Sequence, residues 1–178
     1  MAKQINILSI DPSTTCCGYA VLCCDSEWKG ENLLEKGNIQ PPKKMSIFDK
    51  RDMLRDYLLP IISDYPIDCV FIEKAPLPYK CKFSRSIAIL QATIVFLYDN
   101  ARNQLSPGQV FGACAQTWKG SEGKPITLRN CNYYFKTTLD VEVKGDTDIA
   151  DAIMMGQWFI ERMRLKKTAL LPFHLSTC

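Results

Sequence analysis

The stretch Ile7–Leu22, ILSIDPSTTCCGYAVL, decides how the chain begins to fold. Its apolar start ends at Asp11-Pro12, a pair that breaks regular structure, so we expect a buried strand over Ile5–Ile10. The small residues that follow predict a tight turn, and GYAVLCC at Gly18–Cys24 predicts a second strand. The stretch therefore predicts an antiparallel hairpin with an aspartate at the end of its first strand.

Apolar patterns farther along the chain predict alternating helices and strands. Helical spacing is clearest in Ser84–Asn103, where Ser84 would cap the first turn, and in Thr147–Leu165. We expect Pro60 to kink or end an earlier helix. The remaining predicted elements are strands at Asn32–Ile39, Cys69–Ile72 and Gln109–Ala115 and helices at Met45–Ile62 and Pro125–Leu139. This order predicts an α/β fold with a mixed five-stranded sheet, its first three strands antiparallel, flanked by helices on both faces.

The composition is typical of a globular protein. The 178 residues suit a single domain over 1–178, and 47% hydrophobic with 23% charged residues excludes a disordered chain. A formal net charge of +3 is too small to identify a partner. No apolar run approaches the roughly 20 residues that span a bilayer, so we expect no membrane partner.

Nine cysteines and a single histidine raise the question of zinc or disulfides. Cys16-Cys17 and Cys23-Cys24 are adjacent pairs, but no CxxC spacing occurs, which disfavours structural zinc. The odd number of cysteines and a start that leads straight into a strand, with no signal peptide, favour reduced thiols and a cytoplasmic location.

Four carboxylates fall where the ends of elements would bring them together. Asp11 ends the first predicted strand, Glu73 ends the CVFI strand, and Asp148 and Asp151 share one face at the start of the last helix. Acids at the ends of buried strands are poorly solvated and raise one another's pKa, so they stay ionised only beside cations. Oxygen ligands without histidine or thiolate suit Mg²⁺ or Mn²⁺, and two such ions support in-line attack on a phosphodiester.

Each acid also has a purely structural explanation. Asp11-Pro12 is a common turn pair, and Asp148 is the kind of acid that stabilises a helix N-terminus. Asp146 lies close by and competes with Asp148 for the site. Glu73 is harder to explain in this way, because it directly follows four apolar residues. The set of four acids, rather than any single one, predicts a metal-dependent nuclease.

These motifs resemble the RuvC-type Holliday junction resolvases of the ribonuclease H-like nuclease superfamily. ILSIDPSTTCCGYAVL resembles their opening hairpin, CVFIEKAP (Cys69–Pro76) their second acidic strand and DTDIADAIMMGQWF (Asp146–Phe159) their closing helix. TWKGSEGKP (Thr117–Pro125) resembles their lysine-bearing loop. The resemblance spans Ile7 to about Phe159. The cysteine-rich composition and short loops resemble a phage or viral branch, for which the location would be the host cytoplasm.

The resemblance implies a ribonuclease H-like fold and a Mg²⁺-dependent (or Mn²⁺-dependent) endonuclease with two ions per active site. It also implies a homodimer that makes paired nicks in four-way DNA junctions. The four acidic positions of the family fall on Asp11, Glu73, Asp148 and Asp151. Lys124 falls on the basic position that contacts the scissile phosphate, and Lys119 is a second candidate. A lysine there offsets the negative charge that gathers on the reacting phosphate.

Basic and aromatic residues beyond Glu73 predict a surface that grips phosphates and stacks on bases. The predicted nucleic-acid-binding residues are Lys74, Tyr79, Lys80, Lys82, Phe83, Arg85 and Lys119. A solvated loop is the alternative. Bacterial members of the family usually carry an aromatic residue soon after the second acid, whereas this chain has Ala75, Pro76 and Leu77 there. That departure bears on junction recognition, not on cleavage chemistry. The apolar helix Ser84–Asn103 offers a face for a dimer, unless a monomer buries it completely.

Three other functions fit parts of the pattern. A ribonuclease H-like nuclease acting on other branched DNA or on RNA–DNA hybrids would use the same acids. A sugar-kinase or actin-like ATPase half-domain also opens with a strand, an aspartate and a hairpin, but Pro12 stands where those proteins have a glycine, and a second such domain is needed. A non-catalytic binding module would not need the acids, and all four are present.

Overall fold

The computed structural model describes the backbone of residues 4–74, 82–102 and 110–165. Side chains are described over the same ranges except at 82–85 and 99–102. Among the helices in these ranges, none combines the length and the apolar character needed to cross a membrane.

The described strands form one sheet in the order β3-β2-β1-β4-β5. They are β1 (Gln4–Asp11), β2 (Cys17–Asp25), β3 (Asn32–Ile39), β4 (Cys69–Lys74) and β5 (Val110–Cys114). β2 pairs antiparallel with both β1 and β3, which makes the first three strands a meander. β4 pairs parallel with β1 and with β5. The predicted mixed sheet is confirmed, including its three antiparallel strands.

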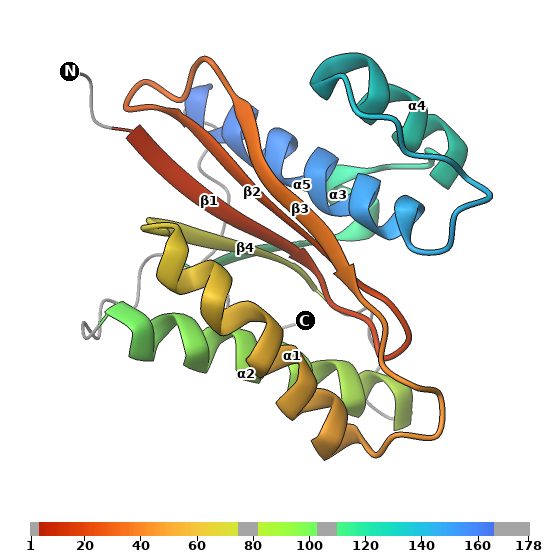
Figure 1. Ribbon diagram of the computed structural model, residues 1–178. Coiled ribbons are helices and arrows are strands. Elements are labelled where there is room, and N and C mark those ends of the chain that lie inside the picture. The colour runs from red at the N-terminus through yellow and green to blue at the C-terminus, as the bar shows by residue number, and fades with distance from the viewer. Residues whose placement is uncertain (1–3, 75–81, 103–109, 166–178) are drawn as a thin grey trace.

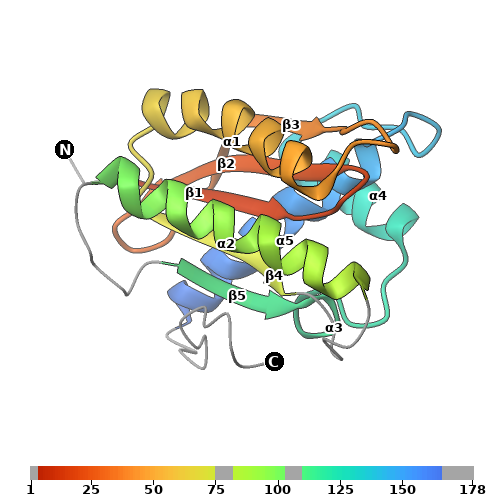
Figure 2. The same cartoon turned by 90° about the horizontal axis from the view of Figure 1, so that it is seen from below.

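Helices cover both faces of this sheet (Figures 1 and 2). α1 (Ile47–Asp64) and α2 (Lys82–Arg102) lie side by side on one face. α5 (Asp146–Arg164) packs across β1 and β2 on the other face, and α4 (Lys124–Phe135) packs against α5. The short helix α3 (Ala115–Trp118) follows β5 directly. The carboxyl end of β1 lies beside the start of α5, because the register partner of Asp11, Gly18, contacts the backbone of Asp148.

The central strands are buried on both faces, which explains their nearly continuous apolar sequences. Successive side chains of β1 point to opposite sides of the sheet. Leu8 belongs to the core cluster that includes Leu58 of α1 and Ile94 of α2. Ile7 belongs to the second cluster, which includes Phe159 of α5. Two separate cores therefore hold β1, and its end with Asp11 is fixed from both sides.

Two helices begin or end differently from the sequence prediction. α1 continues through Pro60 to Asp64, so the proline does not end the helix. The predicted end, Ile62, lies two residues before the observed one. Leu58 and Ile62 on either side of the proline are buried in the core, and this packing outweighs the lost backbone hydrogen bond. α2 begins at Lys82, so the expected cap Ser84 lies inside the helix.

The region between β5 and α5 holds two further differences. α3 was not predicted, because four residues are too few to show a helical period. α4 ends at Phe135 rather than at Leu139, since Lys136 adopts a left-handed conformation with φ 54° and ψ 34°. The Asn132 side chain then binds both backbone groups of Leu139, at 2.8 and 3.0 Å. This turn returns the chain toward α5.

Candidate active site

Two of the predicted acids lie at the ends of neighbouring parallel strands. Asp11 is the last residue of β1, and Glu73 is the next-to-last residue of β4. Ile10 and Ile72 are register partners, so each acid directly follows a paired residue at the same edge of the sheet. Strand pairing alone therefore brings these two carboxylates together.

α5 brings the other two acids to this edge. Asp148 and Asp151 lie in its first turns, where the helix begins next to the β1–β2 hairpin. Gly18 is the register partner of Asp11, and a Cβ added at Gly18 would overlap the backbone carbonyl oxygen of Asp148. The absence of a side chain at position 18 thus allows the close approach of α5. Sequence reasoning missed this role, although a glycine directly after the turn was visible.

The pKa values of the acids show that they form one electrostatic group. Burial raises the pKa of Asp11 well above its ordinary value, and the charges of Glu73, Asp151 and Asp148 raise it further, while Lys124 opposes the shift. Burial also raises the pKa of Asp151, against a hydrogen bond and charge from Lys119. Four carboxylates that are far apart in sequence therefore meet in one poorly solvated place.

Two lysines neutralise part of this charge. Lys124 Nζ lies 2.8 Å from Asp148 Oδ1, and Lys119 Nζ lies 2.5 Å from Asp151 Oδ1. Burial lowers the pKa of Lys124, but the hydrogen bond and charge of Asp148 outweigh burial and raise it overall. The Lys119 side chain is 12% exposed and that of Lys124 is 52% exposed. Both lysines predicted for the site are therefore placed in it, and only Lys124 is open to an incoming ligand.

Trp118 joins the site through its polar edge, and sequence reasoning did not identify it. Its indole Nε1 donates a hydrogen bond to Glu73 Oε2 at 2.9 Å. Burial raises the pKa of Glu73, and this hydrogen bond opposes the rise. Lys119 Nζ lies 5.4 Å from the centre of the Trp118 ring, which is a cation–π distance. The only sequence signal was a Trp-Lys pair just after the last predicted strand.

Hydrogen bonds distinguish Asp146 from Asp148 as the acid of the site. Asp146 Oδ2 accepts a hydrogen bond from the Asp140 backbone at 2.9 Å, and so fixes the turn before α5. Asp148, rather than Asp146, is the acid paired with Lys124.

The Cys16 thiol is a neighbour of Asp148 that sequence reasoning missed. Burial, followed by a hydrogen bond with Asp148, raises its pKa to about 12, so this thiol stays protonated at neutral pH.

The donor atoms of the site suit a hard divalent cation. Among the described residues, no three Asp, Glu, His or Cys side chains form a ready metal site as they stand. Two of the acids are already paired with lysines, Asp151 with Lys119 and Asp148 with Lys124. Burial nevertheless raises the pKa of Asp11, and the charges of Glu73, Asp151 and Asp148 raise it further despite Lys124. Carboxylate oxygens with excess negative charge are the ligands that Mg²⁺ and Mn²⁺ prefer.

The predicted DNA-binding residues lie mostly beyond what the structure describes. Tyr79 and Lys80 fall outside the described residues, and the same holds for the side chains of Lys82, Phe83 and Arg85 in the first turn of α2. Lys74, at the end of β4, is only 9% exposed. Lys119 is engaged with Asp151. The seven cysteines in the described part of the chain carry free thiols.

No family model matches the chain, but comparison with known sequences finds similar proteins. Crossover junction endodeoxyribonuclease RuvC of Ehrlichia ruminantium, strain Welgevonden, is 24% identical over 161 residues, which are 85% of this chain and 94% of the relative. RuvC of the Gardel strain is 25% identical over 156 residues, with the same coverage.

Solved structures of similar fold include RuvC-type proteins as well. Thermus thermophilus RuvC in complex with a Holliday junction substrate matches with a TM-score of 0.74 at 13% identity, over 94% of this chain and 99% of that one. The chain is similar to RuvC-type Holliday junction resolvases in both sequence and fold. The Fowlpox virus resolvase, solved with Holliday junction DNA, also matches, with a TM-score of 0.58 at 16% identity over 89% of this chain. The RuvC-type resemblance and the ribonuclease H-like fold that the motifs implied are confirmed.

Proposed function

We propose that this chain is a structure-specific endonuclease that resolves four-way DNA junctions by paired, metal-dependent phosphodiester hydrolysis. The main support is the group of carboxylates from β1, β4 and α5, in which burial raises the pKa of Asp11 and the charges of the other three acids raise it further. The Ehrlichia ruminantium relative is named as a crossover junction endodeoxyribonuclease, and the Fowlpox virus protein as a resolvase. The match covers 94% of the length of the Welgevonden RuvC, so the proposal concerns a protein of similar extent.

The four acids of the active site are the proposed cation ligands. Asp11, Glu73, Asp148 and Asp151 would hold two divalent ions, Mg²⁺ or Mn²⁺. Such a pair supplies, when bound, a water that is deprotonated near neutral pH and positive charge at the leaving oxygen. The buried carboxylates favour cation binding, because a cation relieves their mutual repulsion. The Trp118 indole holds one oxygen of Glu73 and so restricts the orientation of that carboxylate.

The two lysines have different proposed roles. The exposed ammonium of Lys124 can exchange Asp148 for a phosphate oxygen, and there it offsets the charge of the transition state. Lys119 is enclosed between Asp151 and the Trp118 ring, so it positions these groups. The residues after Glu73 remain proposed DNA contacts: Lys74, Tyr79, Lys80, Lys82, Phe83 and Arg85.

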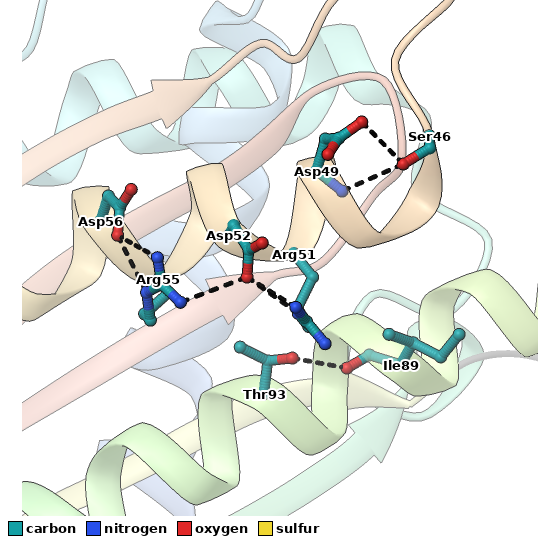
Figure 3. Close-up of polar contacts among 8 residues, drawn as sticks. All are labelled: Ser46, Asp49, Arg51, Asp52, Arg55, Asp56, Ile89 and Thr93. Carbon is teal, nitrogen blue, oxygen red and sulfur yellow. Dashed lines mark hydrogen bonds and ion pairs between the residues drawn. The ribbon is translucent and has the colours of Figure 1, made fainter.

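Paired nicks require two active sites, and we propose that a second copy of the chain supplies the other. A groove of about 390 Å³ lies between α1 and α2, and its lining includes Arg51, Ile89 and Phe96. Phe96 is 67% exposed in the single chain. Figure 3 shows Arg51 of α1 facing the hydrogen-bonded pair Thr93 and Ile89 of α2 across this groove. An apolar groove with a charged rim is typical of a self-associating surface.

Light scattering during gel filtration tests the dimer. A Phe96→Glu variant should elute with the mass of one chain, whereas Phe48→Glu, which changes an aromatic residue that is 58% exposed but does not line the groove, should keep the wild-type mass. A monomeric wild type, or a dimer that survives Phe96→Glu, would remove this surface from the proposal.

Substrate choice separates the proposal from its main alternative. A synthetic four-way junction, a replication fork and an RNA–DNA hybrid would each be incubated with the protein and Mg²⁺, with Asp11→Asn as the inactive control. Symmetric paired nicks near the crossover of the junction alone support a resolvase. Faster cleavage of the fork or of the hybrid would instead identify a ribonuclease H-like nuclease with another substrate.

A further inference from the structure

Lys50 is a buried lysine that is not paired with an acid. It lies in the first turn of α1 and is only 8% exposed. Its ammonium donates a hydrogen bond to the backbone carbonyl oxygen of Thr14 at 2.7 Å. Within the part of the chain that the structure describes, this carbonyl is the one partner of the ammonium. The position of Lys50 therefore calls for a reason other than an ion pair.

Two effects make the start of α1 unfavourable for a buried lysine. Taking an ammonium out of water costs free energy unless its donors are bound. An ammonium has three N–H donors, and the described residues engage one of them here. The N-terminus of a helix also carries partial positive charge, which disfavours a second positive charge in the first turn. An apolar side chain would avoid both costs, so the lysine is better explained by the group that it holds than by the stability of α1.

The group that Lys50 holds is the turn next to the active site. Thr14 lies between β1, which ends at Asp11, and β2, which begins at Cys17. The same turn includes Cys16, whose thiol hydrogen-bonds Asp148. α1 and α5 lie on opposite faces of the sheet (Figure 1). Lys50 thus reaches, from the layer opposite α5, a turn that adjoins two of the proposed cation ligands.

The other hydrogen bonds in the middle of this turn are local. Ser13 Oγ lies 3.2 Å from Thr15 Oγ1 and accepts a hydrogen bond from the Thr15 backbone N–H at 3.3 Å. Both contacts are exposed and join residues two apart, so they shape the turn without fixing it to another element. The hydrogen bond from Lys50 spans 36 residues. It ties the carbonyl of Thr14 to a helix that the core holds in place.

We propose that Lys50 is a positioning residue of the cation site, which acts through the Thr14 carbonyl to hold the β1–β2 turn, and with it Asp11, in the arrangement that binds a divalent ion. Lys50 hydrogen-bonds a backbone carbonyl and no carboxylate, so it acts on the geometry of the site and not by neutralising an acid. Groups that orient metal ligands contribute to metal affinity even though they do not touch the ion. This inference rests on the proposed metal-dependent nuclease function and adds to it a residue from α1.

Cation binding without DNA tests the proposal. Titration calorimetry with Mn²⁺ measures the affinity of the metal-free protein. Lys50→Met keeps an unbranched side chain and removes the donors, so the dissociation constant for Mn²⁺ should rise about tenfold. Lys50→Arg keeps cationic N–H donors at this position and should bind Mn²⁺ within about threefold of the wild type. Unchanged Mn²⁺ affinity in Lys50→Met, or an equal loss in Lys50→Arg, would overturn the positioning role.

A core variant of the same helix separates positioning from a general loss of stability. Ile62 of α1 is 7% exposed and belongs to the core cluster that includes Leu8. Ile62→Val removes one methylene group from this core and lowers the urea midpoint without touching the turn. It should bind Mn²⁺ like the wild type. Equal weakening of Mn²⁺ binding in Ile62→Val and Lys50→Met would assign the effect to stability and overturn the proposal.

Junction cleavage at increasing Mg²⁺ separates this inference from the proposed function. Lys50→Met should need about tenfold more Mg²⁺ for half-maximal cleavage than the wild type does. Its rate at saturating Mg²⁺ should return to within about threefold of the wild type, because the ligands themselves are unchanged. Normal Mn²⁺ binding and normal cleavage in this variant would defeat the inference and leave the nuclease proposal intact. Weakened Mn²⁺ binding, with no cleavage of branched DNA by the wild type, would defeat the nuclease proposal alone. A wild type that binds no Mn²⁺ would overturn both.

Discussion

The acids of the active site and the acids of α1 are held in opposite ways. Asp52 and Asp56 of α1 lie on one helix beside their partners, with Arg55 reaching both at 3.2 and 2.8 Å, as Figure 3 shows. Their side chains are 39% and 64% exposed. The active-site acids come from β1, β4 and α5, and Asp151 has a side chain that is only 7% exposed.

This difference indicates which charged groups affect stability and activity. Exposed ion pairs between neighbours on a helix are screened by water and contribute little. Buried carboxylates gathered from separate elements repel each other, which opposes folding and favours cation binding. The surface pairs are therefore expected to be dispensable, and the buried group is expected to determine activity. The following changes test this contrast, from the largest expected effect to the smallest.

Asp11→Asn should reduce Mg²⁺-dependent junction cleavage by about 10³-fold or more, because it removes a central charge from the cation site. Junction binding, measured by gel shift without divalent ions, should stay close to that of the wild type. Residual cleavage at wild-type rates would show that the buried acids do not determine activity.

Lys124→Ala should slow cleavage by about 10- to 100-fold, because it removes positive charge from the reacting phosphate. Single-turnover rates on the junction measure the effect, and circular dichroism checks that folding is unchanged. Lys29 is also an exposed lysine in an ion pair, with Glu27 at 2.7 Å, but it lies on the β2–β3 turn. Lys29→Ala should therefore cleave normally, and an equal loss in both variants would point to a general charge effect.

Gly18→Ala should lower the free energy of unfolding by about 1–3 kcal/mol, because the added Cβ overlaps the Asp148 backbone and forces α5 away from β2. Urea denaturation measures this loss. Gly123→Ala is the matched control, since a Cβ there meets only Pro125, at 3.8 Å, and should change stability little. Similar stabilities for the two variants would mean that α5 does not depend on Gly18.

The stability of the metal-free protein should depend on pH through Asp11. Its raised pKa means that the folded state binds this proton more tightly than the unfolded chain does. The resulting stabilisation is complete below the unfolded pKa of about 3.9 and is lost as the pH rises through the higher folded pKa. Asp11→Asn removes this dependence, so its Tm should rise relative to that of the wild type between pH 4 and 7.

Calorimetry in EDTA measures this difference, at roughly 2–4 °C for each kcal/mol. Mg²⁺ should raise the Tm of the wild type more than that of Asp11→Asn, since the cation replaces the proton. A Tm difference that is constant over this pH range would show that Asp11 is not electrostatically perturbed.

Arg55→Ala should give the smallest effect, with no measurable change in the urea midpoint, because its ion pairs with Asp52 and Asp56 are exposed. A clear loss of stability would mean that surface pairs of α1 matter more than their exposure suggests.

Much of the fold could be predicted because its signals are local. The apolar runs of β1 and β4 and the helical stripe of α5 each lie within one segment, and all were located to within a few residues. Pro60 does not end α1, which continues to Asp64, because the packing of Leu58 and Ile62 stabilises the helix on both sides of the proline. Trp118 could not be assigned a role, since its partner Glu73 lies 45 residues away.

The sequence by itself determined which residues carry charge at the ends of apolar segments, and through its motifs the RuvC-type resemblance. Only the tertiary structure decided that Asp148 rather than Asp146 pairs with Lys124, that Gly18 allows α5 to approach β2, and that Trp118 binds Glu73. The physical reason is the sequence separation over which each interaction acts. Hydrophobic periodicity depends on neighbours along the chain, whereas hydrogen bonds, steric overlap and carboxylate repulsion depend on distances that exist only after the sheet and α5 have packed together.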